Sequence, residues 1–234
     1  MAKRPLTFAL VLGLLTAGLT AVARQVQRTP ALGPHDFLLS PAQEPGLMAQ
    51  LMAADASWIP KQELIPGVGT RYTYKRRSGE PPLTVDQVKQ LLRDPPRFQQ
   101  EQAAVRSLLQ ALRRSGVTVA LGPPLLQGAA GEWDPQRRLL RIRPDVPAKG
   151  SREFARVLNH EAIHVAQSCH GRGWFQGRAQ LLGLNKQLNA SAIRQLAEPL
   201  YARASAHQRA LEAEAYSNQD QLSLGPQLLA SHCF

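Results

Sequence analysis

Residues 159–169 read NHEAIHVAQSC and carry the pattern His-Glu-x-x-His, formed by His160, Glu161 and His164. The apolar residues around this pattern recur with a helical period, which predicts that it lies on a helix. Positions i and i+4 of a helix differ by only about 40° around its axis, so the two imidazoles stand one above the other. This spacing suits a zinc ion that binds both histidines, with Glu161 beside the metal, where its carboxylate can take a proton from water.

The helix is expected over SREFARVLNHEAIHVAQSCH at 151–170, with Ser151 as a candidate N-cap and Gly171 as a candidate stop signal. Projected at about 100° per residue, its apolar side chains form one broad arc that adjoins the imidazole face. The projection predicts a mostly buried helix whose polar edge faces a cleft. A polar edge that faces open solvent would give the same projection, so the pattern is compatible with a metal site without requiring one.

Two histidines leave one zinc ligand to be found, because zinc used in hydrolysis normally has three protein ligands and one open position. No histidine stands six residues after His164, so the extended three-histidine pattern is absent. The segment ALEAEAYSNQ at 210–219 predicts a later helix that brings Glu212 and Glu214 forward on different faces. The other candidates in the carboxyl-terminal part of the chain are His170, Glu198, His207, Asp220 and His232.

Over residues 151–220 the chain resembles the gluzincin group of zinc metallopeptidases, in which a glutamate on a later helix, commonly in Glu-x-x-Ala, completes the His-Glu-x-x-His site. The match falls on Glu212 as the ligand and on Ala215 as the small residue that lets the two helices approach closely. Tyr216 stands where the family usually has an aspartate that hydrogen-bonds a metal-bound imidazole. The alternatives for that aspartate's role are Glu214, Asn218 and Asp220.

The resemblance implies a zincin-like fold and the hydrolysis of peptide bonds. It implies zinc held by His160, His164 and Glu212, with Glu161 as the general base that activates water. It also implies that the strand around 139–143 acts as an edge strand, to which an extended peptide could add by main-chain pairing. An oxyanion donor is expected as well, and the candidates are Tyr201, His207 and Tyr216.

The remaining patterns predict an α+β fold, with a small antiparallel sheet leading into the HEAIH helix and a mostly helical carboxyl-terminal half. Thr84 and Gln87 have the spacing of a capping box at a helix start, and Gly116 is expected to end a helix that begins after Pro96. The predicted strands lie at 69–77, at 117–121 and on both sides of an Asp134-Pro135 turn. Further helices are expected at 46–55, at 191–204, at 206–220 and near the carboxyl terminus.

Residues 1–23 have the three parts of a secretory signal: a basic start, an uncharged run and a closing Ala-Val-Ala. The run is about 18 residues long, the lower limit for a membrane span, so an uncleaved anchor is the alternative. Residues 24–45 are rich in Pro, Gln and Gly and are predicted to be a linker, which leaves 46–234 as the metallopeptidase domain. The domain is therefore expected to be exported to a periplasmic, lumenal or extracellular space.

Cys169 and Cys233 are the two cysteines of the chain, and in an oxidising compartment they are expected to form a disulfide. This bond would tie the carboxyl terminus to the end of the HEAIH helix. Two buried free thiols are the alternative.

The chain of 234 residues is long enough for one catalytic domain with appendages, and its 28 Lys and Arg against 17 Asp and Glu give a net charge of +11. This charge makes an anionic membrane surface a candidate partner, besides a peptide or protein substrate. Nucleic acid is not favoured, because the basic stretches at 73–79 and 137–143 are short and separated by Pro and Gly. Both stretches are expected to form a solvated basic face.

Two other functions stay open at this point. The missing aspartate leaves room for a catalytically silent zincin-like protein that binds a metal or a partner. A basic binding module, in which HEAIH is incidental, is the third hypothesis, and zinc content would separate it from the other two.

Overall fold

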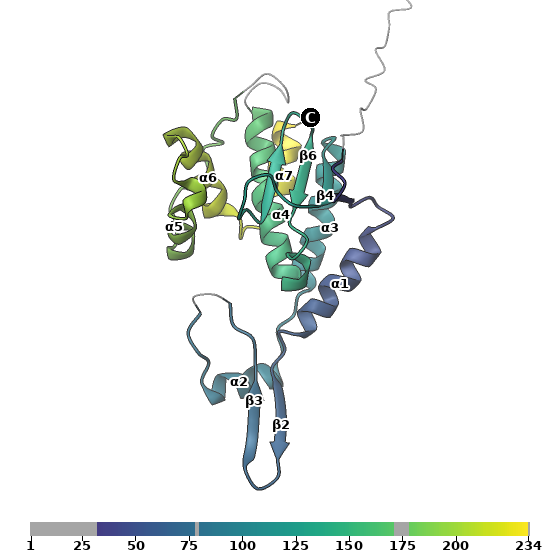
Figure 1. Ribbon diagram of the computed structural model, residues 1–234, viewed down its shortest axis with the longest axis vertical. Helices are drawn as coiled ribbons and strands as arrows, with labels where there is room; N and C mark the ends of the chain where they lie inside the picture. Colours follow the sequence, from purple (N-terminus) through teal and green to yellow (C-terminus); the bar gives the residue numbers. More distant parts are fainter. Residues whose placement is uncertain (1–31, 78–79, 171–177, 234) are drawn as a thin grey trace, which may run out of the picture.

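The computed structural model describes residues 32–77, 80–170 and 178–233 and has an α+β fold (Figure 1). A body in which helices pack against a four-stranded sheet carries a two-stranded hairpin that extends away from it. The helices are α1 (Glu44–Ala56), α2 (Val85–Arg93), α3 (Gln99–Arg114), α4 (Ser151–His170), α5 (Ala190–Leu196), α6 (Ala206–Asn218) and α7 (Leu224–His232), with 3-10 turns η1 (Pro147–Lys149) and η2 (Pro199–Tyr201). The strands are β1 (Phe37–Leu38), β2 (Lys61–Ile65), β3 (Gly69–Thr73), β4 (Thr118–Leu121), β5 (Gly131–Asp134) and β6 (Leu139–Ile142).

Several local sequence patterns are confirmed as elements. Thr84 and Gln87 form the capping box of α2, and α3 ends shortly before Gly116, whose φ of 73° favours glycine. The helix predicted over 191–204 is divided into α5 and η2. Pro199 accounts for the division, because proline lacks the N–H group that a continuing helix needs.

The sheet has the strand order β1-β4-β6-β5 and is mixed, whereas the sequence predicts an antiparallel one. β6 runs antiparallel to β5 but parallel to β4. The four residues of β6 are all buried, so this strand takes an interior position between β4 and β5. β1 and β5 are therefore the edge strands of this sheet, and the prediction that the segment 139–143 is an edge strand is wrong.

Helix α4, which carries the HEAIH pattern, is packed in the centre of the body, as the sequence predicts. It contacts α3, α6, α7 and β5, and its apolar side joins the main core through Phe154, Leu158 and Val165. The polar residues on its other side are thus held in place by a helix that cannot move without disturbing the core.

The start of α4 is capped by a side chain from α1. The Asp55 carboxylate accepts hydrogen bonds from the backbone N–H of Ser151, at 2.7 Å, and from its hydroxyl, at 2.6 Å. Ser151 is the first residue of the helix and not its N-cap, so this detail of the sequence prediction is wrong. The predicted stop at Gly171 lies outside the described residues.

Part of the segment predicted to be a linker, 24–45, belongs to the fold. β1 pairs with β4, Leu39 is buried, and α1 begins at Glu44. This stretch lacks the periodicity that marks an element, because a two-residue strand is too short to show one.

Asp36, in the same segment, forms a buried ion pair with Arg141 on β6, and the two side chains are only 3% and 5% exposed. Nε and Nη2 of Arg141 each donate to the carboxylate at 3.0 Å. Burial alone would raise the pKa of Asp36, but the hydrogen bonds from Arg141 and from the Gly33 amide hold it below its usual value. Arg141 is thus not part of a solvated basic face, because a carboxylate far away in the sequence supplies its counter-charge.

We expect Asp36→Ala to lower the free energy of unfolding by about 3–5 kcal/mol, because it leaves the Arg141 guanidinium buried without its partner. Urea unfolding followed by circular dichroism measures the effect. Asp94→Ala is the matched control, because the Asp94–Arg97 pair is 80% exposed on both sides and its loss should cost no more than about 1 kcal/mol. Equal losses in the two variants would contradict the prediction.

Cys169 and Cys233 form a disulfide that joins the ends of α4 and α7, as predicted. The bond indicates that the protein folds in an oxidising compartment. The predicted signal or anchor at 1–23 lies outside the described residues. Within the ranges that the structure describes, no helix combines the length and apolar character needed to cross a bilayer.

Candidate metal centre

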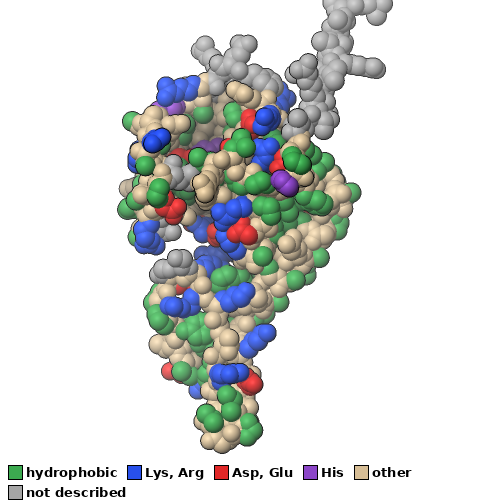
Figure 2. All heavy atoms as spheres, viewed as in Figure 1, with side chains coloured by type: hydrophobic (Ala, Val, Ile, Leu, Met, Phe, Trp, Pro, Cys, Tyr) green, Lys and Arg blue, Asp and Glu red, His purple; other side chains and the backbone are tan. Residues whose placement is uncertain are grey.

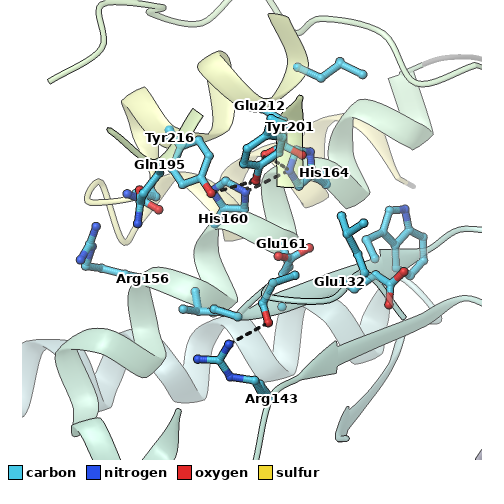
Figure 3. Close-up of a pocket in the computed structure, with 18 of the residues that line it drawn as sticks. Glu132, Arg143, Arg156, His160, Glu161, His164, Gln195, Tyr201, Glu212 and Tyr216 are labelled. Carbon is cyan, nitrogen blue, oxygen red and sulfur yellow. Dashed lines mark hydrogen bonds and ion pairs between the residues drawn. The ribbon is translucent and has the colours of Figure 1, made fainter. Parts of the chain in front are cut away.

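Three side chains from two helices converge on the polar side of α4. His160 and His164 come from successive turns of α4, and Glu212 comes from α6 (Figure 3). The Nε2 atoms of the two histidines lie 3.0 Å apart. Oε2 of Glu212 lies 3.4 Å from Nε2 of His160 and 3.5 Å from Nε2 of His164. In the described part of the chain, this is the one cluster of three or more His, Cys, Asp or Glu side chains with ligand atoms within 4.8 Å of one another.

The separations in this cluster can be compared with the geometry of a tetrahedral zinc site. Ligand atoms that each lie about 2.0–2.1 Å from the ion are roughly 3.3–3.4 Å from one another. The observed 3.0, 3.4 and 3.5 Å are close to this edge length. Two imidazoles and a carboxylate are also a ligand set of catalytic zinc sites, which keep the fourth position open. The three residues therefore fit zinc.

Gln167 orients the ring of His164, a role that the sequence does not reveal. The Gln167 amide nitrogen donates to the carbonyl of Leu211 at 3.2 Å and to the carboxylate of Glu214 at 2.9 Å. Because both partners are acceptors, the amide oxygen must face Nδ1 of His164, at 2.7 Å. When the ring is neutral, Nδ1 therefore carries its proton, and Nε2 has the lone pair that can bind a metal.

Glu214 is fully buried and holds this arrangement from behind. Besides Gln167, it accepts hydrogen bonds from the backbone N–H groups of Leu182, at 2.9 Å, and Leu184, at 2.8 Å. The structure thus brings Glu212 to the histidines and places Glu214 one hydrogen-bonded residue further away. Of the alternatives for the missing aspartate, Glu214 reaches His164 through Gln167.

The other two alternatives for the aspartate have different partners. Asn218 donates to the carbonyl groups of Asn185 and Glu214, both at 2.7 Å. Asp220 pairs with Arg156 at 2.8 Å.

Glu161 is buried in the same pocket and lies against the edge strand β5. Its carboxylate lies on the side of the pocket that faces the two histidines (Figure 3). A side chain at Gly131 of β5 would collide with it, since a Cβ there would come within 2.7 Å of Oε1 of Glu161. Only glycine allows the strand and this carboxylate to approach so closely.

The charges of the cluster shift the pKa values of its members in opposite directions. Burial alone would lower the pKa of His164, but the Glu212 carboxylate raises it to about 9. Burial likewise would raise the pKa of Glu212, whereas the two histidines hold it well below its usual range. Burial raises the pKa of Glu161 to about 8, with the Glu212 and Glu132 carboxylates adding to the shift. Burial lowers the pKa of His160.

Two of the three candidate oxyanion donors lie at the cluster. The Tyr201 hydroxyl donates to Glu212 at 3.2 Å and lies 2.9 Å from the Tyr216 hydroxyl, while the Tyr216 ring packs 4.5 Å from that of His160. Burial raises the pKa of Tyr216 to about 12, so its hydroxyl keeps its proton at neutral pH. Nε2 of the third candidate, His207, lies instead 2.8 Å from the Ala179 carbonyl.

Three further ligand candidates are not part of the cluster. The rings of His170 and His232 lie 4.9 Å from each other beside the disulfide. Glu198 lines the pocket without belonging to the group of ligand atoms.

The cluster opens into a pocket of about 550 Å³. Its lining includes Gly131, Glu132 and Trp133 of β5 and also Tyr201, Leu211 and Tyr216. Among the described strands, β5 pairs with β6 and lies at one edge of the sheet. A strand at the edge of a sheet beside a candidate metal site is suited to hold an extended peptide by main-chain pairing.

Comparisons of the chain with protein-family models, with curated proteins and with solved structures found no match. The function has to be inferred from the arrangement of these side chains alone.

Proposed function

We propose that the protein is a zinc-dependent metallopeptidase that resembles the gluzincins, with His160, His164 and Glu212 as ligands and Glu161 as general base. The observation that carries the proposal is the spacing of the three ligand atoms, which matches the edges of a zinc tetrahedron. A buried carboxylate and an open pocket lie next to them. Metal, base and space for a substrate are the parts that hydrolysis of this kind requires.

Zinc at this site would lower the pKa of a water molecule toward about 7, polarise the peptide carbonyl and offset by its charge the effect of burial on Glu161. Glu161 takes the proton of the attacking water and passes it to the leaving amine. Gln167 keeps the proton of His164 on Nδ1, and Tyr201 holds Glu212 through a hydrogen bond.

Tyr216 is the better candidate for the donor that stabilises the negative oxygen of the reacting carbonyl. Tyr201 gives its one proton to the Glu212 carboxylate, so Tyr216 must be the donor in the hydrogen bond between the two hydroxyls. Turning the Tyr216 hydroxyl toward a substrate would break a bond to a neutral oxygen, which is weaker than the bond of Tyr201 to a carboxylate. A tyrosine whose pKa is raised keeps its proton available for such a hydrogen bond.

The substrate in this proposal is a peptide in extended form that pairs with the edge strand β5. The disulfide supports an exported location, in a periplasmic, lumenal or extracellular space, with residues 1–23 as signal or anchor.

The direct test is to measure zinc and hydrolysis in the same purified protein. We expect one zinc per chain by elemental analysis and cleavage of peptides in a broad library, lost with a chelator and restored by zinc. A protein that binds zinc stoichiometrically and cleaves none of the peptides would indicate the catalytically silent alternative. A protein without zinc would contradict both.

Zinc affinity should rise with pH by roughly tenfold per unit up to about pH 9, because His164 must lose a proton before Nε2 can bind the metal. The stability of the metal-free protein should change in the opposite direction. A histidine whose pKa is raised from 6.5 to about 9 stabilises the fold fully below pH 6.5 and loses this contribution as the pH rises through 9. The pKa of Glu161 is raised to about 8, so this carboxyl also makes the metal-free fold less stable as the pH rises toward 8.

Competition with a chromophoric chelator between pH 6.5 and 9 measures the zinc affinity, and thermal unfolding of the metal-free protein measures its stability. An affinity that is flat over this range would show that His164 binds no proton that zinc must displace.

A further inference from the structure

The hairpin β2–β3, together with α2, projects from the body as a narrow appendage that we define as residues 61–97 (Figure 1). Four of the five residues of each strand are exposed. A two-stranded hairpin of this kind is at best marginally stable in water without a surface to pack against. The base of the appendage is fixed to the body, since Trp58 donates to the carbonyl of Lys149 at 3.0 Å and the Arg77 guanidinium stacks 4.3 Å from the Trp58 ring.

The far end of the appendage is apolar. Val68 and Leu64 are 81% and 75% exposed, the highest values among the exposed large hydrophobic side chains of the described residues. Leu64 lies near the end of β2, and Val68 lies in the turn between the strands, which also contains the exposed Pro66. The turn has no charged side chain, since residues 64–70 read LIPGVGT.

Behind this end the appendage is basic. Residues 61–97 contain eight Lys and Arg and four Asp and Glu, a net charge of +4 (8 − 4). Arg71 is paired with Glu63, but Lys61 on β2 and Lys89 and Arg93 on α2 form no ion pair with another residue that the structure describes. Figure 2 shows cationic side chains distributed along the appendage between its tip and the body.

We propose that this hairpin docks onto an anionic lipid bilayer, with Leu64, Pro66 and Val68 entering the boundary between headgroups and acyl chains. Strand residues are about 3.4 Å apart, so Arg71 lies about 7 Å behind Gly69 and Lys61 about 14 Å behind Ile65. The headgroup layer of one leaflet is about 5–7 Å thick. The apolar tip is thus followed by Arg71, whose charge Glu63 offsets, and then by Lys61. An apolar end with a net positive charge behind it matches the order of acyl chains, anionic headgroups and water.

The same features disfavour other occupants. A phosphate backbone of nucleic acid would attract the cations but would offer no apolar surface to Leu64 and Val68. A second copy of a chain with a net charge of +11 would bring like charges together. A bilayer with anionic lipids satisfies both the apolar tip and the cations, and this inference does not depend on the metal centre.

Amide hydrogen exchange of the full chain in lipid nanodiscs tests the proposal. This local readout is chosen because residues 6–23 could hold the chain on a bilayer by themselves. We expect the amides of 61–73 to exchange at least about fivefold more slowly in nanodiscs with phosphatidylglycerol than in nanodiscs of phosphatidylcholine alone. The double variant Leu64→Ser/Val68→Ser should lose this protection.

Leu125→Ser is the matched control, because Leu125 is 70% exposed and lies outside the appendage; it should keep the protection. Zinc content should be equal in all variants. Equal exchange of 61–73 in the two lipids would overturn the proposal, as would protection that survives in the double variant. Protection by a nucleic acid oligomer, or protection that depends on protein concentration, would assign the hairpin to nucleic acid or to a second copy instead.

Discussion

Replacing Glu161 by glutamine is expected to reduce peptide hydrolysis by about 10²–10⁴-fold and to leave zinc bound. Glutamine has nearly the same shape as glutamate, so it should fit the narrow space beside Gly131. It cannot accept the proton of the attacking water, and general base catalysis is worth about this factor. The three proposed ligands are unchanged, so elemental analysis should still find one zinc per chain.

Glu132→Gln is the matched control for this variant. Glu132 is a second carboxylate of the same pocket, close enough to raise the pKa of Glu161, but it lies on β5 and accepts a hydrogen bond from the Leu125 amide at 2.5 Å. We expect its loss to change activity by less than about tenfold. Full activity of Glu161→Gln would contradict the proposed mechanism even if the zinc site is correct.

The second large effect is expected at Glu212, in contrast with Glu214 two residues later. Glu212→Ala removes a ligand from a site of three and should weaken zinc binding by at least about a thousandfold. Glu214→Ala leaves all three ligands in place and removes only the support of Gln167 behind His164. Such indirect changes typically cost about 10–100-fold in metal affinity.

Glu212→Ala should have the larger effect on zinc affinity, whereas Glu214→Ala should have the larger effect on the stability of the metal-free protein. Glu214 is fully buried and accepts three hydrogen bonds from Gln167, Leu182 and Leu184. Its loss leaves these donors unpaired, at about 1–3 kcal/mol each, so the metal-free Glu214→Ala protein should be clearly less stable than Glu212→Ala. Glu214→Gln, which keeps the volume, provides a second measurement if the alanine variant does not fold.

Chelator competition and thermal unfolding of the metal-free proteins together decide the assignment. Loss of zinc in Glu214→Ala with normal binding in Glu212→Ala would reverse the roles of the two glutamates.

The sequence by itself determined the features that depend on neighbours along the chain. The spacing of His160 and His164 predicts two imidazoles on one side of a helix, because helical geometry alone places positions i and i+4 together. The capping box of α2 and the turn between β5 and β6 are likewise local. The pairing of two cysteines was predictable for a different reason, since there is only one way to pair them.

Tertiary structure decided the features that depend on segments far apart in the chain. The order of the strands depends on β6 taking an interior position in the sheet. The partner of Arg141 is Asp36, which lies 105 positions away in a segment that the sequence predicts to be a linker. The choice between Glu212 and Glu214 depends on how α6 is rotated about its axis against α4. The two glutamates lie on different faces of α6, and the apolar pattern of that helix does not fix the rotation. The role of Gln167 has the same origin: its amide can be oriented only by acceptors on α6, and these meet it only once the two helices have packed.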